Sequence, residues 1–424
     1  MKRNFTSAGM VALGVLGLCT AGAQEKPWNL SAKLRTFYDD NYATLPAGAA
    51  NRDDSFGIEV NPVARMTTGA GPTAVQLIYD YRMRFFEGRG DSQIDNQHLV
   101  TFDVKNKPDD RTTLTFKNVF AYAQEPGVNE TVITSAVKTE GSYFNNRANL
   151  GLQVNLNERV GLETGYENVF YDYEQDNDTV IPVGARSALL DRVEHYFNLS
   201  TRWKVQPTLD GIVGYRYGAI RQTSEDLLAT GVAGRAAPGN ILPNERDADT
   251  HFAFVGADKR FTDVLAGSLR VGIQFTDFPN AQAGASDSAV NPFADSSVTY
   301  RLPSDGSVRL GVKHARNQTD VAFAAGSNPT LDSETTTLYG TVNSRLFGQL
   351  SGGLVFQYQR SSFNGGSQDS KIDNLAALGA NLKYNILPNR LVAETGYSFE
   401  RLDSDITGRS FSRNRVYIGL SATY

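Results

Sequence analysis

Long stretches of this chain alternate between apolar and polar residues with a period of two. From Val75 to Phe85 every second residue is apolar, and the residues between them include Asp80 and Arg82. The stretch from Val193 to Trp203 repeats the pattern. Successive side chains of a β-strand point to opposite faces, so each stretch predicts a strand with one apolar and one polar face.

Eighteen segments of this kind can be recognised along the chain. They lie near 28–38, 55–66, 73–87, 95–106, 111–124, 141–156, 159–173, 190–205, 207–221, 250–261, 264–277, 294–302, 306–322, 333–346, 349–361, 372–386, 390–402 and 411–424. Soluble strands usually have about five or six residues, whereas a strand that crosses a membrane needs about ten. The lengths favour a membrane barrel over a soluble β-propeller or sandwich array, and single-chain bacterial barrels have an even number of strands.

The connectors between these segments alternate regularly between short and long. Eight are short, and nine are longer and rich in Gly, Asp, Asn and Ser, the longest near 222–249. Outer-membrane barrels have short periplasmic turns and longer extracellular loops. We therefore predict an all-β fold, a transmembrane antiparallel up-and-down barrel of about 18 strands with both chain ends in the periplasm. Pro62 falls inside a predicted strand, where it predicts a bulge.

The N-terminus resembles a secretory signal. Lys2 and Arg3 precede an apolar run from Met10 to Cys19, and small residues follow it. We predict that residues 1–23 are a cleaved signal peptide and that residues 24–424 form the barrel. The apolar run is too short to span a membrane as a helix.

Cleavage would change both thiol content and charge. The chain's single cysteine lies in the predicted signal, so the mature protein could form neither a disulfide nor a cysteine metal site. Because the segment carries two cations and no carboxylate, the formal net charge moves from −5 to −7. We expect no nucleic-acid partner for this mildly acidic chain. A membrane-embedded form would have to be a closed barrel, because lipid cannot satisfy open backbone groups.

The final segment alternates toward a terminal aromatic residue. Ile418, Leu420 and Tyr424 share one face. Bacterial outer-membrane barrels commonly end in this way, and we predict that these residues form the signal read by the barrel assembly machinery.

With the apolar face turned to lipid, most strand charges must point into the lumen, because a charge at the bilayer midplane costs about 2–4 kcal/mol. The basic residues predicted to line an anion path are Lys33, Arg35, Arg65, Arg82, Arg84, Arg192, Arg202, Lys204, Arg216, Arg270, Arg309 and Lys313. Lys105, Lys117, Arg345, Lys383, Arg413 and Arg415 complete the inward basic set, against the carboxylates of Glu59, Asp80, Asp103, Glu163, Glu167, Glu194, Asp210, Glu394 and Glu400.

The densest basic cluster is expected at Arg82, Arg84, Arg192, Arg202 and Lys204. Rings of Arg and Lys favour anions. The alternative is that mixed charges only solvate and brace the wall.

No catalytic motif stands out, and we expect neither an enzyme nor a bound cofactor or metal. His195 falls on the lipid-facing register and is interpreted as an interface residue. The acidic run of Asp172, Glu174, Asp176 and Asp178 could suggest calcium, but it lacks the glycine and terminal Glu of an EF-hand loop. A solvated acidic outer loop explains it better.

Several short motifs carry a family resemblance. Tyr38-Asp39-Asp40-Asn41 follows the first segment, a strand from Ser55 to Pro62 and a Gly-rich turn come next, and Asp80-Tyr81 precedes Asp95-Asn96. With these motifs and the alternation of long loops and short turns, the chain resembles the family called putative β-barrel porin type 2. The resemblance implies a pore in the bacterial outer membrane, and a link to exopolysaccharide gene clusters that would bring a polysaccharide cargo and a periplasmic export partner.

The leading hypothesis is a porin-like channel that passes hydrophilic solute, anionic solute included, or polysaccharide through a basic lumen. Its expected partners are outer-membrane lipid, the assembly machinery and the solute. The alternative is a structural or surface-binding outer-membrane barrel whose lumen is plugged by loops.

Overall fold

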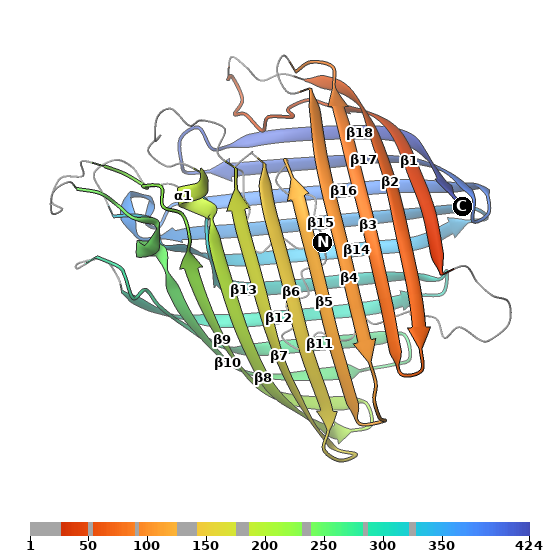
Figure 1. Cartoon of the computed structure of the whole chain (residues 1–424), viewed down its shortest axis with the longest axis horizontal. Coiled ribbons are helices and arrows are strands. Elements are labelled where there is room, and N and C mark those ends of the chain that lie inside the picture. The colour runs from red at the N-terminus through yellow and green to blue at the C-terminus, as the bar shows by residue number, and fades with distance from the viewer. Residues whose placement is uncertain are drawn as a thin grey trace.

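The computed structural model describes residues 27–49, 54–89, 93–124, 142–174, 186–230, 239–282, 287–321 and 328–424. These residues form one closed antiparallel barrel of 18 strands (Figure 1). Each strand pairs with the next along the chain, and β1 pairs with β18 to close the sheet. The predicted signal peptide lies outside the described residues and stays a prediction.

The strands match the predicted segments closely. They are β1 Trp28–Asp39, β2 Ser55–Ala70, β3 Thr73–Phe86, β4 Ile94–Asn106, β5 Thr112–Ala123, β6 Tyr143–Asn155, β7 Val160–Tyr173, β8 Arg192–Gln206, β9 Leu209–Gln222, β10 Ala248–Arg260, β11 Leu265–Asp277, β12 Ser288–Leu302, β13 Gly306–Asn317, β14 Asp332–Phe347, β15 Leu350–Asn364, β16 Ile372–Leu387, β17 Leu391–Ser404 and β18 Phe411–Thr423. The largest difference is β12, which begins six residues before the predicted 294.

Pro292 explains why the start of β12 was missed. A proline inside a strand removes a ladder donor and normally indicates a strand end. Here Pro292 pairs with Ile273 of β11, whereas pairing of β12 with β13 begins only at Ala294 and His314. The proline therefore lies where β12 has a neighbour on one side only.

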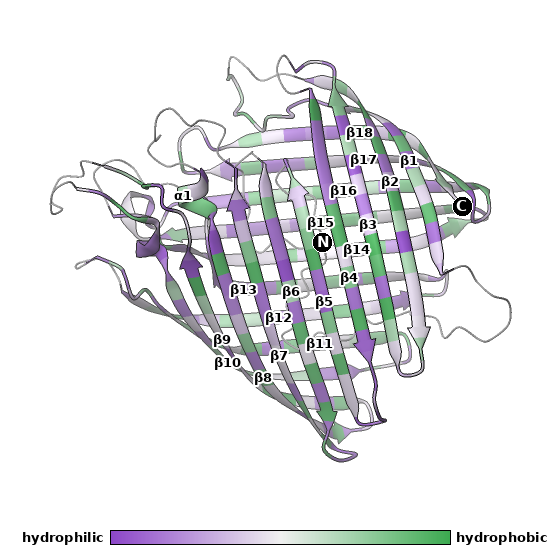
Figure 2. Ribbon diagram, in the orientation of Figure 1, coloured by the Kyte–Doolittle hydropathy of each residue, from purple (hydrophilic) through white to green (hydrophobic). Residues whose placement is uncertain are grey.

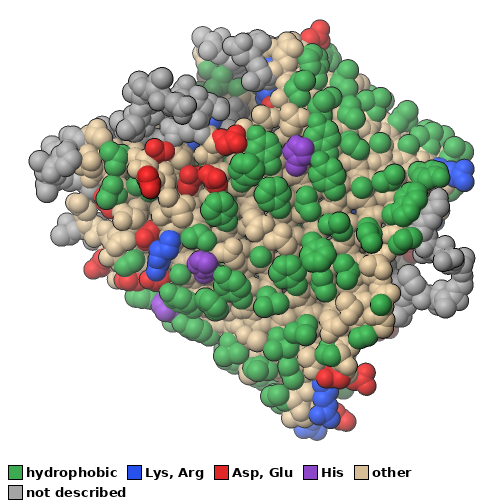
Figure 3. All heavy atoms as spheres, viewed as in Figure 1, with side chains coloured by type: hydrophobic (Ala, Val, Ile, Leu, Met, Phe, Trp, Pro, Cys, Tyr) green, Lys and Arg blue, Asp and Glu red, His purple; other side chains and the backbone are tan. Residues whose placement is uncertain are grey.

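The two faces of the wall differ as the period-two pattern predicts. Outward apolar side chains such as Leu34 and Ile418 are 58% and 63% exposed in the isolated chain. Apolar and polar residues alternate along the strands in Figure 2, and apolar side chains cover much of the wall in Figure 3, with charges mainly toward its ends. His195 lies on the outward face as predicted, and the Tyr166 hydroxyl lies 2.8 Å from its Nδ1.

The connections sort by length to the two ends of the barrel. The eight short turns lie at one end, which we call the short-turn end, and the longer connections lie at the other, the loop end (Figure 1). Gly71, Asp305, Gly348 and Asn389 adopt positive φ within short turns, a conformation that favours Gly, Asn and Asp.

The C-terminal residue sits at the closing seam. The Tyr424 N–H donates to the Leu30 carbonyl over 2.8 Å, and the Tyr424 ring stacks on Trp28 with 5.8 Å between centroids. Ile418 and Leu420 are exposed on the outward face of β18. The role of Ile418, Leu420 and Tyr424 as an assembly signal stays a prediction.

Three short helices of the described residues lie in the loop connections, and one of them is the 3₁₀ turn η2, Gly366–Gln368, between β15 and β16. The other two are α1, Arg186–Leu190, and the 3₁₀ turn η1, Pro243–Arg246. Among the described residues, no helix is both long and apolar enough to cross a membrane.

The bulge predicted at Pro62 is wrong. The pairs Val60–Met83 and Val63–Asp80 have one constant register, so no residue is inserted. Pro62 lacks the N–H that would face Tyr81, and the neighbouring Asn61 supplies a donor instead. Its side-chain amide is fully buried and donates to the Tyr81 carbonyl over 2.7 Å and to Asp80 over 2.6 Å.

Asn61→Ala should lower the free energy of unfolding by about 1–3 kcal/mol, because it leaves the buried Tyr81 carbonyl without its donor. The same change should cost less in a Pro62→Ala background, where a backbone N–H is restored. Urea unfolding in lipid vesicles as a double-mutant cycle measures the difference. Equal costs in the two backgrounds would contradict the compensation.

Candidate functional site: the lumen wall and loop end

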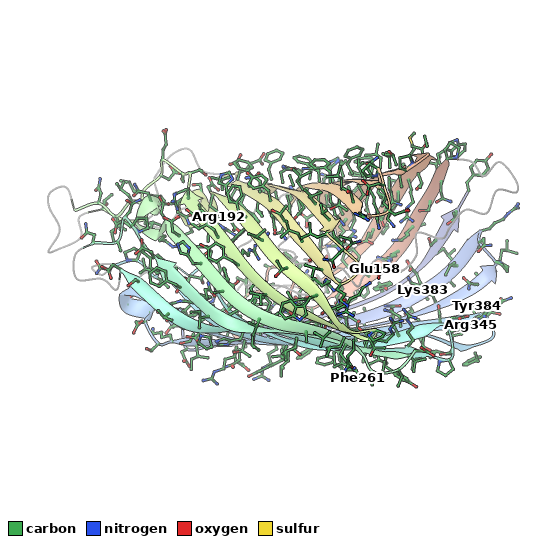
Figure 4. The ribbon with its side chains drawn as sticks, turned by 90° about the horizontal axis from the view of Figure 1, so that it is seen from below. Glu158, Arg192, Phe261, Arg345, Lys383 and Tyr384 are labelled. Carbon is green, nitrogen blue, oxygen red and sulfur yellow. The ribbon has the colours of Figure 1, made fainter. Side chains whose placement is uncertain are left out.

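The strand registers place the twelve predicted path cations on the inward face of the sheet. This face also carries Glu59, Glu167 and Asp258, with which several of them pair. Arg65 and Lys204 lie toward the short-turn end and are exposed. In Figure 4, Arg192 marks the loop end, and Arg345 and Lys383 lie toward the short-turn end.

One carboxylate serves three arginines near the closing seam. Glu59, 4% exposed, accepts from Arg84 Nε at 2.7 Å and from Arg35 Nη1 at 2.8 Å, and Arg82 Nε lies 3.9 Å away. Arg35 also donates through Nε to Glu394 at 2.7 Å. Lys33 and Asp80 lie within the electrostatic reach of the same group, so four cations face three carboxylates and this part of the wall carries excess positive charge.

The opposite balance holds around Arg202. This guanidinium contacts Glu163 at 3.1 Å, Asp210 at 3.2 Å and Asp258 at 2.8 Å. Arg270 approaches the same Asp258 at 2.9 Å. Two cations meet three carboxylates here, so Arg202 supplies no excess positive charge.

The single dense basic cluster predicted from the sequence is therefore wrong. Arg82 and Arg84 lie on β3, whereas Arg192, Arg202 and Lys204 lie on β8, with four strands between them. Even within β8 the residues separate, because Arg192 pairs with Glu194 at 2.7 Å near the loop end.

The sequence reading also missed inward charges. Arg147 on β6 points inward and lies 3.4 Å from Glu167. Asp39 is fully buried and contacts Arg413 at 2.6 Å and Arg415 at 2.7 Å. The sequence pattern ends the first strand at residue 38, but Asp39 continues the inward series of Lys33, Arg35 and Phe37, and this parity is the signal that identifies it. Asp258 and Asp295 were likewise omitted.

A pocket lies on the inward face between β6 and β13. It encloses about 840 Å³ of space between atoms, part of it open to solvent. Glu167 stands between two of its cations, 3.4 Å from Arg147 and 3.6 Å from Arg216. Arg216 in turn lies over the Tyr196 ring at 3.9 Å.

Several loops fold onto the inner wall at the loop end. Leu189, Leu228 and Ile241 form one buried cluster with Val169 and Tyr171, which point inward from β7. These connections therefore occupy part of the barrel mouth.

Two arginines tie these loops together. The buried Arg246 donates to the Leu189 carbonyl at 2.8 Å and to the Thr319 carbonyl. Arg409 contacts Asp320 and Asp373, each at 2.7 Å. The segment at Thr319 and Asp320 is thus bonded to both the β9–β10 and the β17–β18 connections. We call these contacts of Arg246 and Arg409 the loop tie.

The loop end also contains buried titratable groups. Burial lowers the pKa of Arg246 to about 10, so its guanidinium stays charged at neutral pH. Burial, with repulsion from Asp172 and Asp226, raises the pKa of Asp191 to about 7 against the effect of the Tyr173 N–H bond. Asp191 is therefore partly protonated near neutral pH.

The described residues contain no group of three His, Cys, Asp or Glu side chains placed to hold a metal ion. Asp176 and Asp178 of the predicted acidic loop lie outside those residues.

Sequence comparison identifies the family. Residues 30–424 match the family described as putative beta-barrel porin 2. The chain belongs to this family. As a porin of this family it resides in the bacterial outer membrane, where such barrels have short periplasmic turns and longer extracellular loops.

Comparison with curated protein sequences gives no match. Among solved structures, the porin resembles Pseudomonas aeruginosa OpdK with 10% identity and a TM-score of 0.45 over 94% of this chain and 99% of that one. A BenF-like porin from Pseudomonas fluorescens has 10% identity and a TM-score of 0.47 over 94% and 99%. Acinetobacter baumannii OccAB4 has 10% identity and a TM-score of 0.45 over 95% and 99%.

The raised pKa of Asp191 predicts that the loop end loosens as pH rises. The pKa of Asp191 is about 7 in the folded protein and 3.8 in the unfolded chain. Its contribution to the stability of the folded loop is therefore fully present below about pH 4 and is lost as the pH rises to about 7. Hydrogen exchange of residues 186–191, corrected for intrinsic rates, should show greater protection at pH 5 than at pH 8. Asp191→Asn should remove the difference. A pH effect unchanged in that variant would assign it to another group.

Proposed function

We propose that this outer-membrane porin passes small hydrophilic anions in preference to cations. The observation that carries the proposal is the group around Glu59, where Arg35, Arg82 and Arg84 share this carboxylate and Glu394. A pore with low-dielectric walls focuses the field of such charges and raises the local concentration of counter-ions. Inward rings of Arg and Lys select anions by the same effect.

The loop tie favours a small solute over a polymer. Arg246 and Arg409 hold the connections together at the barrel mouth, and a polysaccharide would need a wider path than a small ion. A polysaccharide cargo and a periplasmic export partner stay predictions of the family resemblance.

The second candidate is a structural or surface-binding barrel whose lumen is plugged by loops. The inward packing of Leu189, Leu228 and Ile241 favours it, because these residues fill part of the mouth. The two functions differ in one measurable property, which is conduction by the wild-type protein.

Replacing Arg82 and Arg84 together by Gln should reduce anion preference. The change leaves Arg35 between Glu59 and Glu394, so the buried carboxylates keep a partner. Reversal potentials in planar bilayers under a salt gradient should show wild-type anion preference and a fall of about twofold or more in the anion-to-cation permeability ratio. The wild-type preference should weaken toward 1 M salt, as the Debye length shrinks from about 10 Å at 0.1 M to about 3 Å.

Arg401→Gln is the matched control, because Arg401 lies on β17 but is exposed and pairs with the exposed Asp403. Its ratio should equal that of the wild type. Cation preference in the wild type, or an unchanged ratio in the double variant, would overturn the proposal.

Arg246→Ala should raise single-channel conductance, because it removes both bonds that tie the β7–β8 and β13–β14 connections to η1. Arg246→Lys keeps the charge but loses the forked donor, and it should give an intermediate value. Equal conductance in all three proteins would show that the loop tie does not narrow the path. A silent wild type with a conducting Arg246→Ala variant would favour the plugged barrel.

A further inference from the structure

We propose that the inward pocket between β6 and β13 binds an aromatic carboxylate, with its ring on a patch of phenylalanines and its carboxylate at Arg216. The inference deepens the proposed anion channel by naming a substrate class, and it rests on that function. Three independent features of the pocket support it.

The first feature is an aromatic patch where a polar wall is expected. Phe252 and Phe254 on β10 and Phe293 on β12 point inward and are 7–8% exposed. The Phe293 ring lies 5.4 Å from Phe252 and 6.0 Å from Phe254, centroid to centroid. The interior of a conducting barrel is normally polar, so three rings on one part of the wall form a site for an apolar group.

The second feature is positive charge on both sides of that patch. Arg216 lies on β9, the strand before Phe252, and Lys313 lies on β13, the strand after Phe293. The pocket lining contains five cationic side chains and three carboxylates. The Arg216 Cζ lies 3.9 Å from the centre of the Tyr196 ring, and this contact restrains the guanidinium beside the aromatic patch. A guanidinium held in one orientation suits a planar carboxylate, which can accept from two of its donors.

The third feature decides between an aromatic acid and a sugar acid. Three neutral polar side chains of the pocket already bond to the backbone, and the Tyr196 hydroxyl already donates to Glu194. Gln274 donates to the Arg316 carbonyl at 3.2 Å and accepts from the Arg316 N–H at 2.8 Å. Thr250 donates to the Gly218 carbonyl at 3.3 Å, and Asn317 donates to the Ala315 carbonyl at 3.2 Å. A ligand rich in hydroxyl groups would have to break these bonds, whereas an aromatic carboxylate needs only a ring surface and a cation.

Calorimetric titration of the detergent-solubilised porin with benzoate, acetate and glucuronate tests the proposal. Benzoate should bind measurably tighter than either of the other two acids. Arg216→Gln should weaken benzoate binding about tenfold or more, since a hydrogen bond to a charged group is lost. Phe293→Leu should weaken it several-fold while leaving acetate unchanged.

Matched controls come from the same inward face outside the pocket. Arg345→Gln and Phe37→Leu replace an inward arginine and an inward buried phenylalanine that do not line it. Both should keep the benzoate affinity within about twofold, because distant sites act independently.

The outcomes separate this inference from the proposed function. Equal binding of benzoate and acetate, tighter binding of glucuronate, or equal losses in pocket and control variants would overturn the aromatic site. An anion-selective wild type that fails to bind benzoate would overturn the site and leave the proposed function standing. Benzoate binding by a protein that never conducts would overturn the proposed function and leave the aromatic site standing.

Discussion

Within a bilayer every backbone N–H and C=O must find a partner in the protein, and closure of the sheet meets this requirement. The seam between β1 and β18 runs from Ser31–Thr423 to Asp39–Arg415 and leaves no open edge between the first and last strands. The side-chain hydrogen bond beside Pro62 meets the same requirement for a backbone partner. Where the backbone lacks a donor, the side chain of Asn61 supplies one to the next strand. Closure also divides the side chains into those that meet lipid and those that enclose the lumen.

The distribution of charge follows from that division. Lipid excludes charge from the outward face, so strand arginines and carboxylates crowd onto the inward one. Crowded arginines repel one another unless carboxylates lie between them, and Asp39, Glu59 and Glu167 each stand between two or more. Arginine suits these networks because its planar fork can contact two partners at once, as Arg35 does with Glu59 and Glu394. The uneven ratio of partners leaves positive charge at some places on the wall and negative charge at others.

The loop connections are free of the lipid constraint and use a different chemistry. Their apolar residues pack on the inward face of β7 near the loop end, and the buried side chain of Arg246 donates to carbonyl groups of two other connections. Burial and repulsion from Arg192 lower the pKa of Arg246 against the attraction of Asp320 and Asp332. The mouth is therefore shaped by loop contacts, while the charge of the deeper lumen is shaped by strand contacts.

The sequence alone determined the barrel, because the face on which a strand residue lies depends only on the parity of its position. The alternation located all eighteen strands and placed residues such as Arg84, Arg216 and His195 on the correct face. The errors at Pro62 and Pro292 arose because a proline's effect depends on which neighbour its missing donor would face. Only the tertiary structure decided which charges meet. Arg35 and Glu394 are 359 residues apart and touch because β17 and β1 both flank β18. The aromatic patch beside Arg216 likewise arises from the relative registers of β9 to β13. These registers fix the position of each side chain along the barrel axis, and no local pattern in the chain encodes them.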